Sequence, residues 1–249
     1  MKLYAIADLH MPGGMEKPMD VFGAHWEGHV EKIFDDWRQR VGEDDAVLIP
    51  GDISWAMYLK DAEPDLQALG ALPGRKVLLR GNHDYWWSSV TKIREILPEN
   101  MALVQHCAVD LGACVVCGTR LWKCPGCGEE MTAEDEKIFR RECMRLEMAL
   151  QDAVRIARGR PIIVMTHYPP LYASLQETEF TGILEKFPIY YVVYGHLHGK
   201  GIEARFEGEH HEIRYKLASC DALGFRLWEL ALREETIQGR AGSAGSIAL

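Results

Sequence analysis

The sequence predicts an α/β fold with parallel strands, and two observations support this. Five short apolar runs each end abruptly in polar residues, which is typical of strands covered on both faces. Segments with the apolar period of a helix separate several of these runs. In such alternating folds, functional residues collect at the carboxyl ends of the strands. The five runs are residues 3–7, 46–50, 76–80, 162–166 and 191–194.

Three helices are predicted between these strands. Residues 26–41 place their apolar positions on one helical face. Asp61 is expected to cap a shorter second helix. Thr132 and Asp135 have the spacing of a capping box, with Asp in place of the usual Glu, and are expected to open a long helix that ends before Gly159.

The last part of the chain has a different pattern. After residue 200 the apolar residues predict further strands over 201–206, 211–217 and 225–232. Residues 239–249 are small and polar and are expected to form a loose tail. The sequence contains no repeat and no linker, so residues 1–238 are predicted to be a single domain.

The composition is that of an ordinary globular protein. Of 249 residues, 47% are hydrophobic and 26% are charged, which is enough for a sizeable core. No apolar run approaches the roughly 20 residues that span a bilayer, and residues 3–7 are too short for the core of a signal peptide, so we expect a cytoplasmic protein. The formal charge of −9 argues against a nucleic-acid coat protein, though not against a nuclease.

The chain has seven cysteines, an odd number that argues against a disulfide framework. The pairs Cys114–Cys117 and Cys124–Cys127 have the spacing of a zinc knuckle. However, residues 112–119 have a strand pattern, and residues three apart on a strand point to opposite faces. Three interpretations remain open: a structural metal site, a redox pair formed by the second two cysteines, or small apolar core residues.

The polar residues that follow the five runs form a set suited to metal binding. Carboxylates, imidazoles and an amide without cysteine suit Mn²⁺, Fe²⁺ or Zn²⁺. One ion needs three or four protein ligands, so seven or more indicate two ions, about 3.5–4 Å apart, with a carboxylate shared between them. The side chains are Asp8, His10, Asp52, Asn82, His83, Asp84, His167, His196 and His198.

These motifs resemble those of the calcineurin-like metallophosphoesterase superfamily. Asp-x-His, Gly-Asp, Gly-Asn-His-Asp, a single His and Gly-His-x-His occur in that family's order over about 190 of 249 residues. The longer strings at 51–57, 81–87 and 166–170 are similar to a branch of small prokaryotic phosphoesterases. The resemblance implies two mixed β-sheets packed face to face with flanking helices, a four-layer αββα sandwich, with the site at one edge.

The family's ligand scheme can be placed on matching residues. It implies two divalent ions (Mn²⁺, Fe²⁺/Fe³⁺ or Zn²⁺) that share Asp52. By this resemblance, one ion is held by Asp8, His10, Asp52 and His198, and the other by Asp52, Asn82, His167 and His196.

Such a centre implies hydrolysis of a phosphate ester. Two divalent ions lower the pKa of a shared water and offset negative charge on the phosphoryl group. His83 neighbours a ligand without being needed as one, so we expect it to protonate the leaving group. Asp84 either holds His83 as an oriented imidazolium or caps the loop with its carboxylate.

The favoured function is phosphodiester hydrolysis, with a nucleotide or nucleic-acid end as substrate. This preference rests on the resemblance to small prokaryotic relatives. One alternative is a phosphomonoesterase, including a protein Ser/Thr phosphatase, although Gly51–Ser54 lacks the extended Gly-Asp-x-Val-Asp-Arg-Gly signature of those enzymes. A second alternative is a catalytically silent interaction scaffold, which should have lost ligands. The sequence carries no signal for oligomeric state.

Substrate contacts are predicted for two further residues. Arg120 is expected to contact phosphate, because a guanidinium fork matches phosphate geometry; the alternative is an ion pair with a surface acid. Tyr168 belongs to a group of aromatic residues close to the motifs, which either form a platform for a nucleobase or aryl group or pack to make the site rigid. The group comprises Trp55, Tyr85, Trp86, Trp87, Trp122 and Tyr168.

Overall fold

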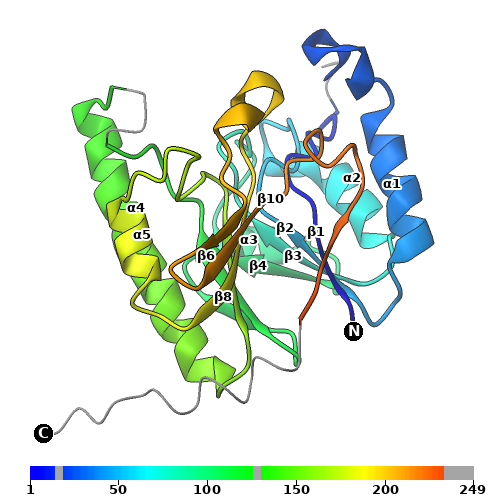
Figure 1. The fold of residues 1–249 in the computed structure, drawn as a ribbon. Helices are drawn as coiled ribbons and strands as arrows, with labels where there is room; N and C mark the ends of the chain where they lie inside the picture. The colour runs from blue at the N-terminus through cyan, green and yellow to red at the C-terminus, as the bar shows by residue number, and fades with distance from the viewer. Residues whose placement is uncertain (15–18, 126–129, 233–249) are drawn as a thin grey trace, which may run out of the picture.

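The structure is a computed structural model that describes residues 1–14, 19–125 and 130–232. Two β-sheets pack face to face between two layers of helices (Figure 1). Helices α1 (His29–Arg40) and α2 (Leu59–Gly70) cover one sheet, and α4 (Ala133–Ala157) and α5 (Glu179–Leu184) cover the other. The predicted four-layer sandwich is confirmed.

The first sheet is built mainly from the N-terminal part of the chain. Its strand order is β11-β1-β2-β3-β4, in which β1 to β4 run parallel and β11 pairs antiparallel with β1. The carboxyl ends of β1 to β4 therefore meet at one edge. The strands are β1 (Leu3–Ala5), β2 (Ala46–Ile49), β3 (Arg75–Leu79), β4 (Met101–Val104) and β11 (Trp228–Leu230).

The second sheet has the order β5-β6-β7-β8-β10-β9. Its four inner strands run parallel, and an antiparallel strand lies at each edge, so both sheets are mixed. The strands are β5 (Ala108–Asp110), β6 (Val115–Thr119), β7 (Ile162–Thr166), β8 (Ile189–Tyr194), β9 (Gly208–His210) and β10 (Ile213–Leu217).

Three apolar layers hold the four structural layers together. Successive side chains of a strand point to opposite faces of its sheet. In β1, Tyr4 packs with Trp37 of α1, whereas Ala5 lies between the two sheets. In β7, Ile163 lies between the sheets and Val164 packs beneath α4. Both faces of both sheets are thus buried, as the continuous apolar runs predicted.

The packing of α4 on the second sheet can be tested at Leu146. This side chain is fully buried in the layer between α4 and the sheet. Leu146→Ala is expected to lower the free energy of unfolding by about 2–5 kcal/mol, because it leaves a cavity. Met148→Ala, on the exposed face of the same helix, should change it by less than about 0.5 kcal/mol. Urea denaturation measures both, and equal effects would contradict this packing.

The first two helices begin at different residues from those predicted. The segment expected to be helical from residue 26 starts at His29, because Gly28 adopts a left-handed conformation with φ 59° and Trp26 lies in a short 3-10 helix. Asp61 does not cap α2, which begins two residues earlier at Leu59. Its carboxylate lies in the first turn instead, where the helix dipole favours negative charge.

Helix α4 begins as predicted. The Thr132 hydroxyl accepts a hydrogen bond from the backbone N–H of Asp135, and the Asp135 carboxylate accepts one from the N–H of Thr132.

The strand predicted over 201–206 is wrong, since Gly199–Ala204 form a 3-10 helix. Gly199 and Gly201 disfavour a strand at this position. The strands predicted over 211–217 and 225–232 are present in shorter form as β10 and β11.

Cys107, Cys114, Cys117, Cys143 and Cys220 are free thiols. Cys114 lies between the two sheets, whereas Cys117 lies beneath α4, so the two cannot hold a common ion and the zinc-knuckle interpretation fails for this pair. Burial raises the pKa of the Cys114 thiol to about 12, as expected for an inert core residue. Cys127 lies outside the described residues.

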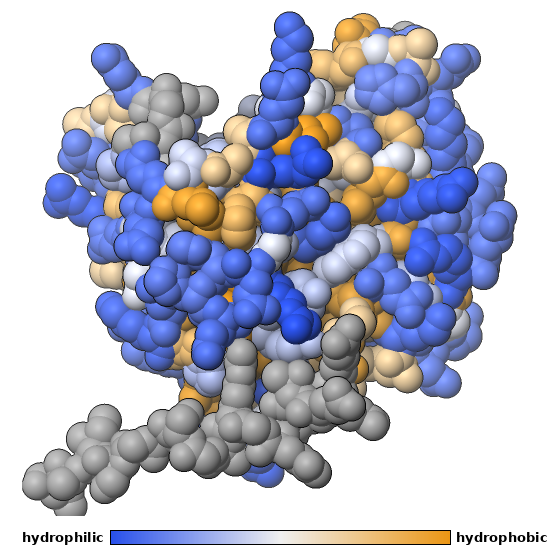
Figure 2. Space-filling view, in the orientation of Figure 1, coloured by the Kyte–Doolittle hydropathy of each residue, from blue (hydrophilic) through white to orange (hydrophobic). Residues whose placement is uncertain are grey.

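The face drawn in Figure 2 is mainly hydrophilic with small separated hydrophobic patches. Among the described residues, no helix is both long and apolar enough to cross a membrane. The tail predicted over 239–249 lies outside the described residues, and the assignment of 1–238 to a single domain remains a prediction.

Candidate metal centre

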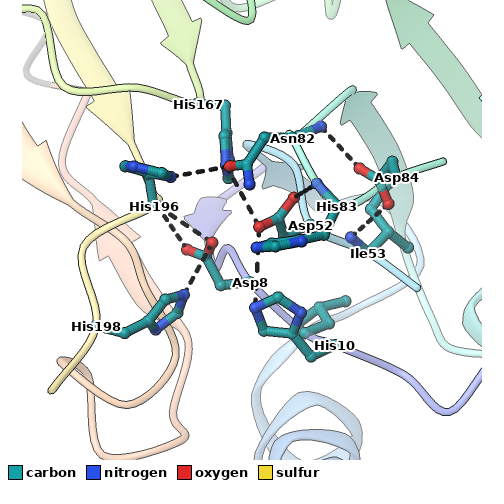
Figure 3. A network of polar contacts seen from close by, with 12 residues as sticks. Asp8, His10, Asp52, Ile53, Asn82, His83, Asp84, His167, His196 and His198 are labelled. Carbon is teal, nitrogen blue, oxygen red and sulfur yellow. Dashed lines mark hydrogen bonds and ion pairs between the residues drawn. The ribbon is translucent and has the colours of Figure 1, made fainter. Parts of the chain in front are cut away.

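Polar side chains from both sheets meet at the carboxyl ends of their strands. The loops after β1, β2 and β3 belong to the first sheet, and those after β7 and β8 belong to the second (Figure 3). Within the first sheet, the N–H of Asp8 donates to the carbonyl of Gly51 (2.9 Å). Between the sheets, the N–H of His196 donates to both carboxylate oxygens of Asp8 (3.0 and 3.1 Å).

The backbone at this edge adopts conformations that side-chain-bearing residues rarely take. The φ angles are 61° at Asp8, 44° at His10, 51° at Asp52 and 76° at His196. Each such residue costs about 1–3 kcal/mol and persists only where its surroundings determine it, which is common at functional sites. Four residues with positive φ lie at this edge of the sheets. They indicate that the contacts of the side chains, and not backbone preference, determine the conformation of these loops.

Asp52 lies at the middle of the group. Its Oδ2 is 3.4 Å from Nε2 of His167 and 3.9 Å from Nε2 of His10, while its Oδ1 accepts a hydrogen bond from the N–H of His83 (2.8 Å). Burial raises the pKa of this carboxyl, but His167 and His10 outweigh burial and hold the pKa below its usual range. One buried anionic oxygen therefore faces imidazoles from both predicted ligand groups.

Asn82 is the centre of a second group of polar side chains. Its Oδ1 lies 2.6 Å from Nε2 of His167 and 2.9 Å from Nδ1 of His196 (Figure 3). Together with Asp52, these residues present two oxygens and two imidazole nitrogens. This donor set fits a divalent ion of borderline character.

Asp8, His10 and His198 form the other group. One ligand atom from each of the three lies within 4.8 Å of the other two. Nε2 of His198 is 3.2 Å from Oδ1 of Asp8. Nδ1 of His10 is buried and has no hydrogen-bond partner among the described residues. Buried nitrogens of this kind usually have a partner. These residues also fit a divalent ion.

Two imidazole rings are oriented by acceptors on the side that faces away from the site. Nδ1 of His167 lies 2.9 Å from the carbonyl of Pro50, and Nδ1 of His198 lies 3.0 Å from Oδ1 of Asp221. Such contacts fix the tautomer and direct Nε2 into the site. Asp221 was missed in the sequence, although it too follows a strand, β10, which ends at Leu217. The rule that found the other carboxylates could have found it.

Removing the carboxylate behind His198 provides a test. Asp221→Asn is expected to weaken metal binding by about 10- to 100-fold, because the ring loses the acceptor that orients it and raises its basicity. Competition with a fluorescent chelator measures the affinity. Asp35→Asn, an exposed position on α1, is the control and should leave it unchanged. Equal affinities for the two variants would contradict the orienting role.

The buried carboxylates of Asp8 and Asp52 dominate the electrostatics of the candidate histidine ligands. Burial lowers the pKa of His167 and of His198, but Asp52 and Asp8 outweigh it and raise these values to about 9 and about 10. By contrast, burial lowers the pKa of His10 to about 4. A bound cation would compete with protons on the first two rings, so metal affinity is expected to increase with pH.

His83 lies beside the candidate ligands. Its ring centroid is 4.8 Å from that of Trp55 and 5.8 Å from that of His10. The residue is partly exposed. This position suits a proton donor better than a ligand.

Asp84 has a different environment. Its buried carboxylate accepts hydrogen bonds from the N–H groups of Ile53 (2.9 Å), Ser54 (3.2 Å) and Gly81 (2.7 Å) and from the indole of Trp86 (2.9 Å). Within the described part of the chain it makes no hydrogen bond to the neighbouring His83 ring. Of the two roles considered for it, the structure supports the loop-capping carboxylate, and it does not support direct orientation of His83.

The predicted substrate contacts lie on the side of the second sheet. The Tyr168 ring packs 4.1 Å from that of His196, and only 6% of the residue is exposed. Arg120 places its guanidinium 4.4 Å from the Trp122 ring, and its carbonyl accepts the N–H groups of His167 and Tyr168. It forms no ion pair with an acid among the described residues, so the surface-pair alternative lacks support.

Most of the aromatic residues close to the motifs pack against other side chains. Trp86 and Trp87 are buried, with 1% and 5% exposed. Trp55 stacks on His10 with centroids 4.5 Å apart and an interplanar angle of 19°. Tyr85 is 52% exposed beside His83 and is available to a ligand.

Comparison with known proteins finds similar solved structures and a matching sequence family. A search of curated protein sequences gives no match. Among solved structures, the chain is similar to phosphopantetheinyl hydrolase from Mycobacterium tuberculosis, with a TM-score of 0.54 and 15% identity over 94% of this chain and 97% of that one. A protein of unknown function from Aquifex aeolicus gives a TM-score of 0.49 and 15% identity over 92% and 95% of the chains.

The family model of the calcineurin-like phosphoesterases matches residues 1–200, which contain all the candidate ligands. This match covers most of the chain and spans both sheets. The chain belongs to the calcineurin-like phosphoesterase family and is a metal-dependent phosphoester hydrolase.

Proposed function

We propose that the chain is a dinuclear phosphohydrolase that prefers phosphodiesters. The observation that carries the proposal is the position of Asp52, whose Oδ2 faces His10 on one side and His167 on the other. Asp8 and His198 complete the first ligand group, and the second is completed by Asn82 and His196. Mn²⁺, Fe²⁺ and Zn²⁺ all suit these donors.

The protein side chains supply the rest of the chemistry. Bound divalent ions supply an activated water and offset charge on the phosphoryl group. His83 donates a proton to the oxygen of the leaving group, and the ring of Trp55 limits its movement. Asp84 holds the loop that carries His83 through its hydrogen bonds to the backbone.

The diester preference rests on the resemblance to small prokaryotic phosphoesterases. A diester phosphoryl group carries one negative charge, whereas a monoester carries up to two. A nucleotide or nucleic-acid end would present such a diester to Tyr85 and Trp55.

Two assays on the purified full chain test the proposal. With added Mn²⁺, Fe²⁺ or Zn²⁺, kcat/KM for bis-p-nitrophenyl phosphate should exceed that for p-nitrophenyl phosphate, and metal analysis should give two ions per chain. A higher value for the monoester would favour the phosphatase alternative. A single ion per chain would rule out the dinuclear assignment.

We also propose that the protein acts in the cytoplasm. Cys107, Cys114, Cys117, Cys143 and Cys220 are free thiols, and all but Cys107 are buried. Free thiols are typical of a reducing compartment.

A further inference from the structure

A small cavity lined by arginines lies beside the candidate metal centre. Its volume is about 270 Å³, smaller than the roughly 300–1,000 Å³ of sites for drug-sized ligands, so it suits a single small group. We call it the arginine pocket and define it by Arg80, Arg120, Arg141, Arg145, His106 and Glu142.

The pocket adjoins the metal centre through the strand order. Arg80 follows β3 and immediately precedes Gly81 and Asn82. Arg120 follows β6, and its carbonyl accepts the N–H of the candidate ligand His167 (3.1 Å). The pocket therefore lies at the same edge of the sheets as the metal centre, next to the ligand group that contains Asn82.

The positive charge of the pocket is largely uncompensated. Its single carboxylate, Glu142, is occupied by Arg145 (2.7 Å) and by the Thr119 hydroxyl. Arg80, Arg120 and Arg141 form no ion pair with any acid of the described residues. Three guanidinium groups thus share one cavity without a matching anion of the protein.

Two buried polar atoms in the pocket also lack partners. Nε of Arg80 and Nδ1 of His106 are shielded from solvent and have no hydrogen-bond partner among the described residues. Arg120 is partly buried as well. Like charges are costly to gather in a partly buried space, and unpaired buried donors are rare. A bound anion would offset the positive charge and would accept hydrogen bonds from the unpaired donors.

We propose that the arginine pocket binds a second anionic group of the substrate, a phosphate distant from the ester bond that is cleaved. The substrate class is then a phosphodiester that carries a terminal phosphate on one of its arms. Guanidinium forks match the tetrahedral oxygens of phosphate, and charge-assisted hydrogen bonds are among the stronger polar contacts. This inference rests on the proposed function and specifies its substrate.

Binding can be measured without catalysis. Inorganic pyrophosphate is titrated calorimetrically into the full chain after chelator treatment, with circular dichroism to verify folding. We expect one site, weakened about 10- to 100-fold in the double variant Arg80→Gln, Arg120→Gln. The control is Arg38→Gln, Arg155→Gln, which removes two exposed arginines elsewhere and should bind as the wild type does. Equal binding by both double variants would overturn the proposal.

Kinetics then link the pocket to the substrate. The substrates are alkyl p-nitrophenyl phosphate diesters with arms of increasing length, each with and without a phosphate at the far end. For the wild type, the terminal phosphate should raise kcat/KM about 10-fold or more at one arm length, and this ratio should fall toward unity in Arg80→Gln, Arg120→Gln. A ratio near unity in the wild type at every length would overturn the proposal.

The two failures are distinguishable. If the wild type hydrolyses plain and phosphorylated diesters equally well, the pocket proposal fails and the proposed function stands. If it hydrolyses neither with any of the metals, the proposed function fails, and the pyrophosphate titration alone decides whether the pocket binds an anion.

Discussion

Asp52→Asn is expected to abolish binding of both ions and, with it, all measurable turnover. Oδ2 of Asp52, which faces both His10 and His167, is anionic, and a carboxylate with its two oxygens could serve two cations at once. Asparagine has a single, neutral oxygen. Elemental analysis of the purified variant, prepared without chelators, measures the metal content.

The control for this substitution is Asp35→Asn, which removes the same charge from an exposed position of α1. It should retain both ions. If Asp52→Asn also retained two ions per chain, the shared carboxylate would have to be another residue, and the arrangement proposed for the centre would be wrong.

His83→Ala is expected to keep both ions but to lower kcat by about 10²- to 10⁴-fold, the usual contribution of a positioned acid. Its ring lies beside the candidate ligands without joining them. The loss should be larger for an alkyl ester than for a p-nitrophenyl ester, because a good leaving group needs little protonation. Steady-state kinetics with matched alkyl and aryl diesters, together with metal analysis, test this.

His211→Ala serves as the matched control, since His211 is exposed and pairs with Glu177 outside the candidate metal centre. It should retain full activity. Full activity of His83→Ala on the alkyl ester would refute the acid role, whereas loss of the ions in that variant would show that His83 contributes to metal binding.

The strand ends were the part of the site most accessible to sequence reasoning. A buried parallel strand is a continuous apolar run, so its last residue can be recognised and the polar residues after it can be assigned to one edge. This placed Asp8, Asp52 and His167 close together before any geometry was known. This pattern could not indicate which nitrogen of each imidazole ring points into the site, because that depends on acceptors such as the Pro50 carbonyl.

Other features depend on contacts distant in sequence. Asp84 could be read as a partner of His83 or as a loop cap, and only the positions of Ile53 and Gly81 decide between them. The arginine pocket was not recognised, because its members follow different strands or lie on α4. Elements such as β5 and α3 (Val90–Arg94), of three and five residues, carry too little periodicity to be identified.

The hydrogen bonds from the N–H of His196 to the carboxylate of Asp8 join residues 188 positions apart, one from each sheet. Cations held between the same loops would link the two sheets reversibly. Ligand that binds the folded chain at 100 times its dissociation constant adds about 2.7 kcal/mol to stability. Resistance of the whole molecule to heat and proteases would therefore follow the supply of metal.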